Sequence, residues 1–569
     1  MLRVRAQAET ATLTTSRDQF YKEIVETMRF RNLTTKPSGI LTILFIGIVM
    51  HGVCGQRSFA DDAREKAAHR QRRMIFNNDG DDAWFSGAPV TKEGFLSMRL
   101  DHIGDCGIDS MFYCTTMSIN SFSHNSQITE VFTADLDSKN LLDGNATSNR
   151  MLALIKAQTD PLELAIETCR EHDIEIIWTL RMNDVHDSFV PEFLSQWKKD
   201  HPQFLMGTPE DSAETAPKDP RHFWSWADFE HQEVHDVILV AVKDVLDRYD
   251  IDGVDLDFQR HICYFEETRR YEPVTAEHCD MLTDLVGKIR EEVLAASERK
   301  GKPILTSARV LATLEQNRRF GLDVEKWADN GYLDFITTGC GYDPFTMPDD
   351  MIRQGHAWGL PVYRCFSNSA MLQEMVSHTD LIPENLEAWR AVAANAWHDG
   401  VDGVMSFNLF PKLPGTPQTE LARTAWQEMG DPEGLVGLDK LYCIEHLHYD
   451  DNCYLFKSVP REGRLPVTIS KGATVKRNLP VADDISGLAD RIEKLHLRIC
   501  LEGFQSDDQV DVTMNGTRLD ALPEKPLWLA ADVPPEAMRQ GKNNLVVGYS
   551  SGTAEALVMT SVELTVDYK

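Results

Sequence analysis

The sequence predicts an α/β protein, in which a closed (β/α)8 TIM barrel of parallel strands is followed by an antiparallel β-sandwich. First, short apolar segments alternate with amphipathic helical segments from residue 73 to about residue 440, as in a parallel barrel. Second, residues 77–82 read Asn-Asn-Asp-Gly-Asp-Asp, which is not the glycine-rich phosphate turn of an open doubly wound sheet. Third, 569 residues suit two or three domains, and after Trp426 the pattern changes to short alternating segments.

The barrel strands are expected where short apolar runs interrupt the helical pattern. In chain order they are Arg73–Asn78, Ser110–Cys114, Ile174–Met182, Gly253–Phe258, Ile304–Val310, Phe335–Thr338, Pro361–Cys365 and Gly403–Asn408. Helices are expected between them, among others at Val234–Tyr249, Ala276–Ala296 and Glu384–His398. The barrel domain is therefore placed at residues 70–440.

Residues 441–569 are expected to form the β-sandwich, as an accessory domain. Its strands are expected at Leu465–Ile469, Lys494–Cys500, Gln509–Met514, Asn544–Gly548 and Val558–Val566. Asn515-Gly516 is a strong signal for a two-residue hairpin turn. A carbohydrate-binding role and a purely structural role are both compatible with such a domain.

The N-terminal residues 1–60 are expected to contain a signal peptide. An apolar run, Ile40 to Val53, follows several basic residues and is too short for a stable membrane-spanning helix. Ser58 and Ala60 offer small side chains for a cleavage site, and a start at Met28 would make the signal compact. The sequence thus predicts a secreted or periplasmic protein with no membrane span after cleavage, and a retained anchor is the alternative.

Charge and cysteine usage limit the classes of partner. The chain has 58 Lys and Arg against 89 Asp and Glu, a formal net charge of −31, which disfavours nucleic acid and anionic membrane surfaces. The 11 cysteines are scattered without a CxxC pair, so no structural zinc pattern is present. The sequence predicts neither a metal nor a cofactor.

The fourth expected strand carries the strongest candidate site. In an extended strand Asp255 and Asp257 share one face, and in a barrel the inward residues at the C-terminal end of a strand line the active-site mouth. Two carboxyl groups this close perturb each other's pKa, and Arg260 is a natural counter-ion, with His261 beside it. The pair suits acid/base or nucleophilic catalysis, and a buried structural ion-pair network is the alternative.

Polar residues also follow the third strand. Arg181, Asn183, Asp184 and His186 come directly after an apolar run, as expected for a loop at the barrel mouth. Arg181 is suited to clamp a carboxylate or a substrate hydroxyl, with Asn183 and His186 as hydrogen-bonding partners. A solvated loop with no role in binding is the alternative.

Three further residues are expected to line the mouth. Asp79 follows the first strand in an acidic and amide-rich loop whose spacing fits no recognised calcium pattern, so we expect it to contact substrate hydroxyls. Arg309 shares a face of the fifth strand with Ser307 and is expected to pair with Asp255 or Asp257. Asn408 ends the eighth strand and is expected to face the mouth.

The chain resembles the secreted (β/α)8 glycoside-hydrolase-like proteins described as family-10-type glycosylhydrolase-like. The matching segments are Arg181–Asp184, Asp252–His261, Ser307–Val310 and Gly400–Val404. A more distant similarity is to the family 18 chitinases, whose fourth strand reads Asp-x-x-Asp-x-Asp-x-Glu. Gln259 stands at the position of the proton-donating glutamate, and an amide cannot donate that proton.

This resemblance implies an enzyme that hydrolyses O-glycosyl bonds of a poly- or oligosaccharide. Asp257 is expected to be the nucleophile or electrostatic stabiliser, Asp255 to tune it, and Asp184 or Asp343 to be the general acid. Residues expected to orient the substrate are Arg181, Arg260, His186 and His261. The alternative is a catalytically inactive carbohydrate-binding protein on the same fold.

Overall fold

The computed structural model describes residues 59–83, 91–132, 151–215, 220–341, 350–367, 386–411, 415–444 and 465–569. Residues 1–58, which include most of the expected signal segment, lie outside the described residues, and so does Asp343. No helix within the described ranges is long and apolar enough to cross a membrane.

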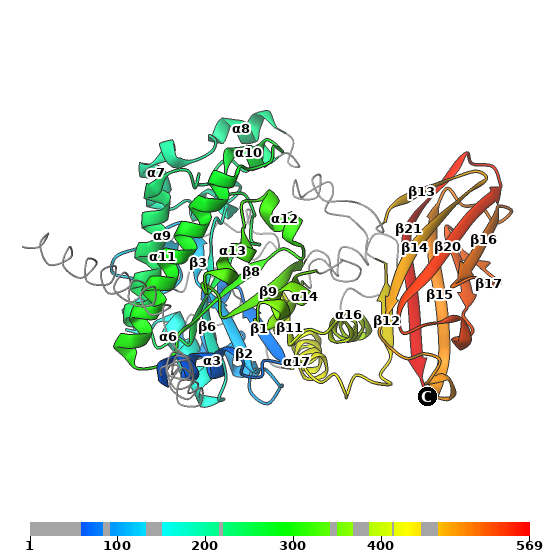
Figure 1. Cartoon of the computed structure of the whole chain (residues 1–569), viewed down its shortest axis with the longest axis horizontal. Helices are drawn as coiled ribbons and strands as arrows, with labels where there is room; N and C mark the ends of the chain where they lie inside the picture. Colours follow the sequence, from blue (N-terminus) through cyan, green and yellow to red (C-terminus); the bar gives the residue numbers. More distant parts are fainter. Residues whose placement is uncertain are drawn as a thin grey trace, which may run out of the picture. The chain divides into compact units, whose positions relative to one another are not determined.

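Eight parallel strands close into a barrel, in the spatial order β1-β11-β10-β9-β8-β7-β6-β2 (Figure 1). Their bounds are β1 Met74–Asn78, β2 Ser110–Cys114, β6 Glu175–Arg181, β7 Gly253–Asp257, β8 Leu305–Val310, β9 Phe335–Gly341, β10 Val362–Ser367 and β11 Gly403–Phe407. Each strand begins within one residue of the position expected from the sequence. The predicted (β/α)8 barrel is therefore confirmed.

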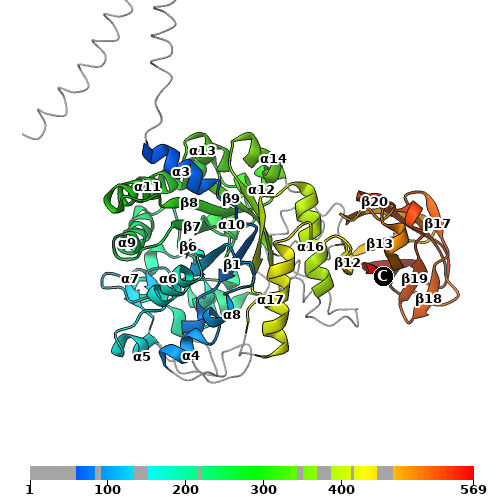
Figure 2. The same cartoon turned by 90° about the horizontal axis from the view of Figure 1, so that it is seen from below.

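Helices lie around the outside of the barrel strands, as Figure 2 shows. The longer ones are α3 Phe59–Ala68, α6 Pro161–Glu171, α9 Gln232–Arg248, α11 Ala276–Lys300, α16 Leu386–Asp399 and α17 Pro417–Met429. Shorter helices are α4 Lys92–Leu96, α5 Met151–Lys156, α7 Gln196–Asp200, α8 Pro209–Glu214, α10 Glu266–Arg269, α12 Leu314–Arg319, α13 Val324–Asp329 and α14 Asp350–Ala357. The helix bounds expected from the apolar periodicity at α9, α11 and α16 hold to within a few residues at each end.

The barrel interior is apolar at one level and polar nearer the C-terminal ends of the strands. A buried apolar cluster inside the strands includes Ile75, Phe112, Ile177, Leu305, Phe335, Tyr363 and Met405. Ile177 and Leu305 flank Gly253 in the strand register, so Gly253 also faces inward. Because side chains alternate along a strand, Asp255 and Asp257 face inward above this cluster.

Two antiparallel sheets with their own apolar core follow the barrel. One sheet contains β12 Lys440–Cys443, β21 Ala556–Tyr568, β15 Ile492–Glu502, β19 Trp528–Asp532 and β18 Leu522–Lys525, with β13 Val467–Ser470 paired to β21. The other contains β14 Ala473–Val481, β20 Gly541–Ser551, β16 Gln509–Met514 and β17 Thr517–Leu519. A small third sheet, β3 Thr116–Ser118, β4 Ser121–Phe122 and β5 Glu130–Val131, follows β2.

The hairpin expected at Asn515-Gly516 joins β16 to β17. Met514 pairs with Thr517, which leaves a two-residue loop. Both loop residues have positive φ, 51° at Asn515 and 88° at Gly516, as a type I′ turn requires. The C-terminal part of the fold prediction is thus also confirmed.

Candidate functional site at the barrel mouth

Asp257 is an ion-paired carboxylate at the C-terminal end of β7. Arg309 on the neighbouring β8 donates to both of its oxygens, with the Nε contact at 3.0 Å. The backbone N–H groups of Gln259 and Arg260 donate to the Oδ1 of Asp257 at 2.9 Å and 3.0 Å. Asp257 is 1% exposed, so these four donors take the place of water around its carboxylate. Arg309 was expected to pair with Asp255 or Asp257, and in the structure its partner is Asp257.

Asp255 lies two residues before it, on the same inward face, and its surroundings are different. The Ser307 hydroxyl donates to the Oδ1 of Asp255 at 2.8 Å. Burial, and next the charge of Asp257, raise the pKa of Asp255 to about 7. Asp255 therefore retains a proton at pH values where an ordinary aspartate has lost it.

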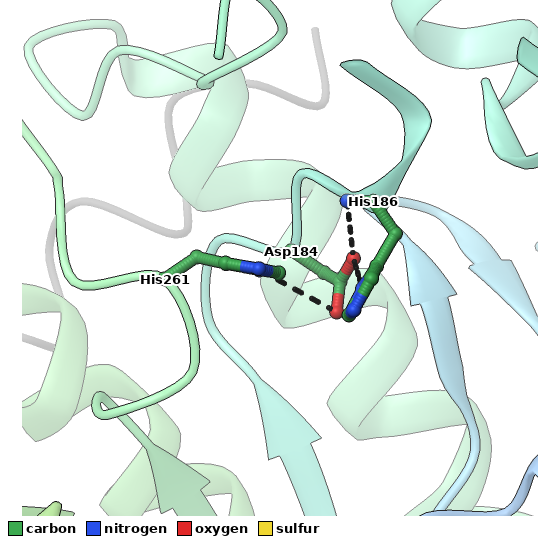
Figure 3. A group of neighbouring side chains, drawn as sticks. All are labelled: Asp184, His186 and His261. Carbon is green, nitrogen blue, oxygen red and sulfur yellow. Dashed lines mark hydrogen bonds and ion pairs between the residues drawn. The ribbon is translucent and has the colours of Figure 1, made fainter. Parts of the chain in front are cut away.

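A second cluster is built on the loop after β6, around Asp184 (Figure 3). The Oδ1 of Asp184 accepts from the backbone N–H of His186 at 3.0 Å and lies 2.7 Å from the Nδ1 of His186. Its Oδ2 accepts from Arg181 at 3.2 Å, and the Nδ1 of His261 lies 3.9 Å from it. Burial opposes ionisation, but His186, His261 and Arg181 together hold the pKa of Asp184 well below its usual range.

The low pKa of Asp184 bears on its expected role. A general acid must carry a proton at the working pH, and the surroundings of Asp184 favour the ionised form. The low pKa therefore disfavours Asp184 as the proton donor. Its position suits a group that orients the side chains around it.

His186 connects Asp184 to Arg260. The Nδ1–H of His186 faces the Asp184 carboxylate, and its Nε2 lies 2.7 Å from the Nη2 of Arg260. A guanidinium can only donate, so the Nε2 is the acceptor and the imidazole is neutral. Burial lowers the pKa of His186, Asp184 acts against this, and the charge of Arg260 lowers the pKa further.

Of the other residues expected at the site, Asp79 and Arg181 pair with each other at the barrel mouth, whereas Asn183 is buried among backbone groups. Asp79 pairs with Arg181 at 2.8 Å, which joins the loop after β1 to β6. Asn183 is buried and gives its side chain to backbone groups of Ala227 and Cys263. The side-chain amide of Asn183 therefore has few hydrogen-bonding positions available for a substrate. Asp79 and Arg181 lie at the mouth.

Two features at the mouth were not predicted from the sequence: the backbone conformation of Asn408 and the contacts of Arg99. Asn408 is half-buried with a φ of 59°, an uncommon conformation that no sequence pattern announced. Arg99, which lies in none of the segments considered from the sequence, pairs with Asp81 and donates to the Oδ1 of Asn78 at 2.7 Å. Arg99 sits between two expected strands, and its role arises only because the chain folds back on the loop after β1.

The cluster of Asp184, His186 and His261 has ligand atoms within 4.8 Å of one another, a spacing that would suit a metal ion. However, the guanidinium groups of Arg181 and Arg260 contact this cluster directly. A divalent cation there would face two positive charges, and His186 already donates to Asp184. The donor set therefore does not fit a metal centre.

Several buried polar atoms near the mouth have no hydrogen-bond partner in the described part of the chain. They are the Oδ1 of Asn77, both amide atoms of Gln259, the Oγ1 of Thr337 and the Oγ of Ser367. Buried polar groups in folded proteins are almost always satisfied by protein, water or ligand. These atoms are consistent with a mouth that binds a polar molecule.

Residues 146–283 match the family model Glycosyl hydrolase-like 10. This segment contains β6, β7 and the loops that carry Asp184 and Arg260, so the resemblance inferred from the sequence is confirmed. No curated protein matches the chain.

Solved structures similar to the chain include carbohydrate-active enzymes. A cycloisomaltooligosaccharide glucanotransferase from Paenibacillus sp. has 10% identity over 87% of this chain and 57% of its own, with a TM-score of 0.33. An alpha-L-fucosidase from Paenibacillus thiaminolyticus has 13% identity over 64% of this chain and 49% of its own, with a TM-score of 0.38. A family GH18 chitinase from Chromobacterium violaceum has 11% identity over 94% of this chain and 95% of its own, with a TM-score of 0.35. The chain thus spans about half the length of the first two.

Proposed function

We propose that this chain is an exported glycoside hydrolase that cleaves a poly- or oligosaccharide by carboxylate chemistry at the barrel mouth. The family match over residues 146–283 supports a glycoside-hydrolase-like protein, and export rests on the apolar run at residues 40–53. The proposal takes its mechanism from the β7 acids.

The observation that carries it is the contrast between Asp255 and Asp257. One carboxyl group is paired with Arg309 through both of its oxygens, and the other, two residues away on the same face, has a pKa of about 7. Neighbouring titratable groups whose environments push their pKa values apart are typical of acid/base sites. A purely structural ion pair would need Asp257 and Arg309 but not a second, protonated acid.

The contacts of Asp257 favour one of its two expected roles. Its oxygens already accept four hydrogen bonds, from Arg309 and from two backbone N–H groups. A carboxylate with its lone pairs so occupied has little capacity to attack the sugar as a nucleophile. We assign Asp257 as electrostatic stabiliser and Asp255 as the proton-holding residue that tunes it.

The proton donor to the leaving group is then Asp343. Of the two candidates for this role, Asp184 lies in surroundings that keep it ionised. Asp343 follows the end of β9 by two residues in the sequence, and loops after barrel strands supply catalytic groups.

A second function is favoured by Gln259. This residue stands where a chitinase-like enzyme has its acid, and it is 2% exposed with both amide atoms unpartnered among the described residues. A protein that binds a glycan without cleaving it would have the same features. For such a protein, calorimetry would detect oligosaccharide binding, and no reducing ends would be released.

Release of reducing ends from a polysaccharide panel tests the proposal. We expect wild type to cleave at least one glycan, and Asp255→Asn and Asp257→Asn to lose about 100-fold or more in rate, the size of an acid/base contribution. Asp252→Asn is the matched control, because Asp252 precedes the same strand at its other end and pairs with Arg170 there. Equal cleavage of a glycan by wild type and both mouth variants would refute the assignment.

A further inference from the structure

Arg260 differs from the other arginines that surround the mouth. Arg99, Arg181 and Arg309 each form an ion pair with an aspartate. No carboxylate among the described residues lies within ion-pair distance of Arg260; its side-chain partner is the neutral His186. A guanidinium is positively charged at any physiological pH, so a half-buried one without a carboxylate partner is suited to bind an external anion.

The position of Arg260 is set by a chain of contacts. Asp184 orients His186 through its Nδ1, and the Nε2 of His186 accepts from Arg260. The guanidinium carbon of Arg260 lies 5.8 Å from the ring centre of Phe407, an inward residue of β11. These contacts position the guanidinium. His186 carries no charge, and Asp79, whose pKa the charge of Arg260 helps to lower, forms its ion pair with Arg181 instead.

Arg260 and its neighbour also have unused hydrogen-bonding groups. The Nε of Arg260 is buried with no partner in the described ranges, and so are the Nε2 and Oε1 of Gln259. A buried donor without an acceptor is destabilising, because it has lost its hydrogen bonds to water and gained none in the protein. An oxyanion that accepts from the Arg260 guanidinium would remove this cost, and the amide of Gln259 is a second donor next to it in the sequence.

We propose that the glycan bound at the mouth carries an anionic group, a carboxylate or a sulfate ester, and that Arg260 binds this group. Gln259 supplies a second donor, and His186 and Asp184 are positioning residues that act through Arg260. The inference rests on the proposed function in one respect: a glycan must bind at the mouth.

The net charge of −31 does not oppose a local contact of this kind. At physiological salt the Debye length is about 8 Å, so distant surface acids are screened. Salt screens the attraction between a partly buried guanidinium and an oxyanion in direct contact with it much less.

An array of paired oligosaccharides tests the inference by binding alone. Each uronate is paired with its carboxyl-reduced form and each sulfate ester with its desulfated form, so the two sources of negative charge are distinguished. We expect wild type to bind the anionic member of at least one pair about 10-fold or more tighter, the effect of a charge-assisted hydrogen bond. Arg260→Gln should lower this ratio to about one, and Arg260→Lys should leave an intermediate ratio, because it keeps the charge but loses the fork.

Two further variants make the test specific. Arg170→Gln is the matched control; it removes the same charge from an exposed arginine that pairs with Asp252, and the ratio should not change. His186→Gln should lower the ratio itself, because the guanidinium that His186 positions acts on the charged member of each pair; a merely structural role would weaken both members alike and leave the ratio unchanged. Thermal unfolding of each variant confirms that it is folded.

The outcomes separate the inference from the proposed function. Equal wild-type affinity for both members of every pair would overturn the anionic substrate, even if a neutral glycan is cleaved. An anionic preference that survives Arg260→Gln would overturn the role of Arg260. Preferential binding that depends on Arg260, without release of reducing ends, would support the inference and overturn the hydrolase. Failure to bind any glycan on the array would overturn both.

Discussion

Replacing Asp255 with asparagine should remove a large part of the pH dependence of barrel stability. The pKa of Asp255 is raised from its ordinary value of 3.8 to about 7 by burial and by the charge of Asp257. A carboxyl with a raised pKa in the folded state stabilises the fold fully at low pH. This stabilisation is lost as the pH rises through the folded pKa, because the unfolded chain ionises more easily.

The magnitude follows from the shift. Each pKa unit corresponds to about 1.4 kcal/mol, so a shift of about three units costs about 4 kcal/mol once both states are ionised. Part of this is already lost at about pH 5, and about 3 kcal/mol is lost between about pH 5 and about pH 8.5. The asparagine side chain has no proton to lose, but it can still accept from Ser307. The isosteric variant should therefore lack this decline.

The assay is urea unfolding of the barrel at about pH 5 and about pH 8.5, for wild type and Asp255→Asn. The difference in free energy of unfolding between the two proteins should shift by about 3 kcal/mol in favour of the variant at the higher pH. Asp252→Asn serves again as control. A difference that stays constant within about 0.5 kcal/mol between the two pH values would show that Asp255 is ionised at neutral pH, and the acid/base reasoning would then fail.

Three other substitutions test separate parts of the structure. Arg309→Met should cost about 3–5 kcal/mol in urea unfolding, because it leaves the Asp257 carboxylate buried without its counter-ion; a cost below about 1 kcal/mol would contradict this. Gln259→Met should leave thermal stability unchanged or raise it, because it removes unpartnered amide atoms, and should weaken glycan binding in calorimetry about 10-fold. A clear loss of stability would mean that the amide is satisfied. Gly516→Ala should cost about 1–2 kcal/mol in urea unfolding of the sandwich, because φ at Gly516 is 88°; no cost would exclude strain in this turn.

The strands were predictable because their signal is local. Most barrel strands are short apolar runs between polar segments, and β7 alternates apolar and acidic residues. β2 and β16 have the bounds that the sequence predicts. The inward direction of Asp255 and Asp257 was also predictable, since alternation along a strand depends only on the strand itself. The hairpin at Asn515-Gly516 follows from backbone preferences of two residues.

The partners of the site residues were not predictable in the same way. Asn183 appeared as a binding residue from its neighbours in the sequence, yet its amide joins two backbone segments of other loops. Arg99 lies outside every pattern recognised in the sequence, yet it pairs with Asp81 in the loop after β1. Such contacts depend on which loops meet in space.

The sequence by itself determined the barrel, the sandwich and the strand on which the acids lie, because periodicity and turn chemistry act over a few residues. Only the tertiary structure decided the state of each acid. Arg309 from the neighbouring strand pairs with Asp257, and the charged and polar groups around Asp184 lower its pKa. Burial raises the pKa of Asp255 to about 7, and Arg260 has no carboxylate partner among the described residues. Electrostatic free energies depend on distance and exposure in the folded chain, and neither can be read from the order of the residues.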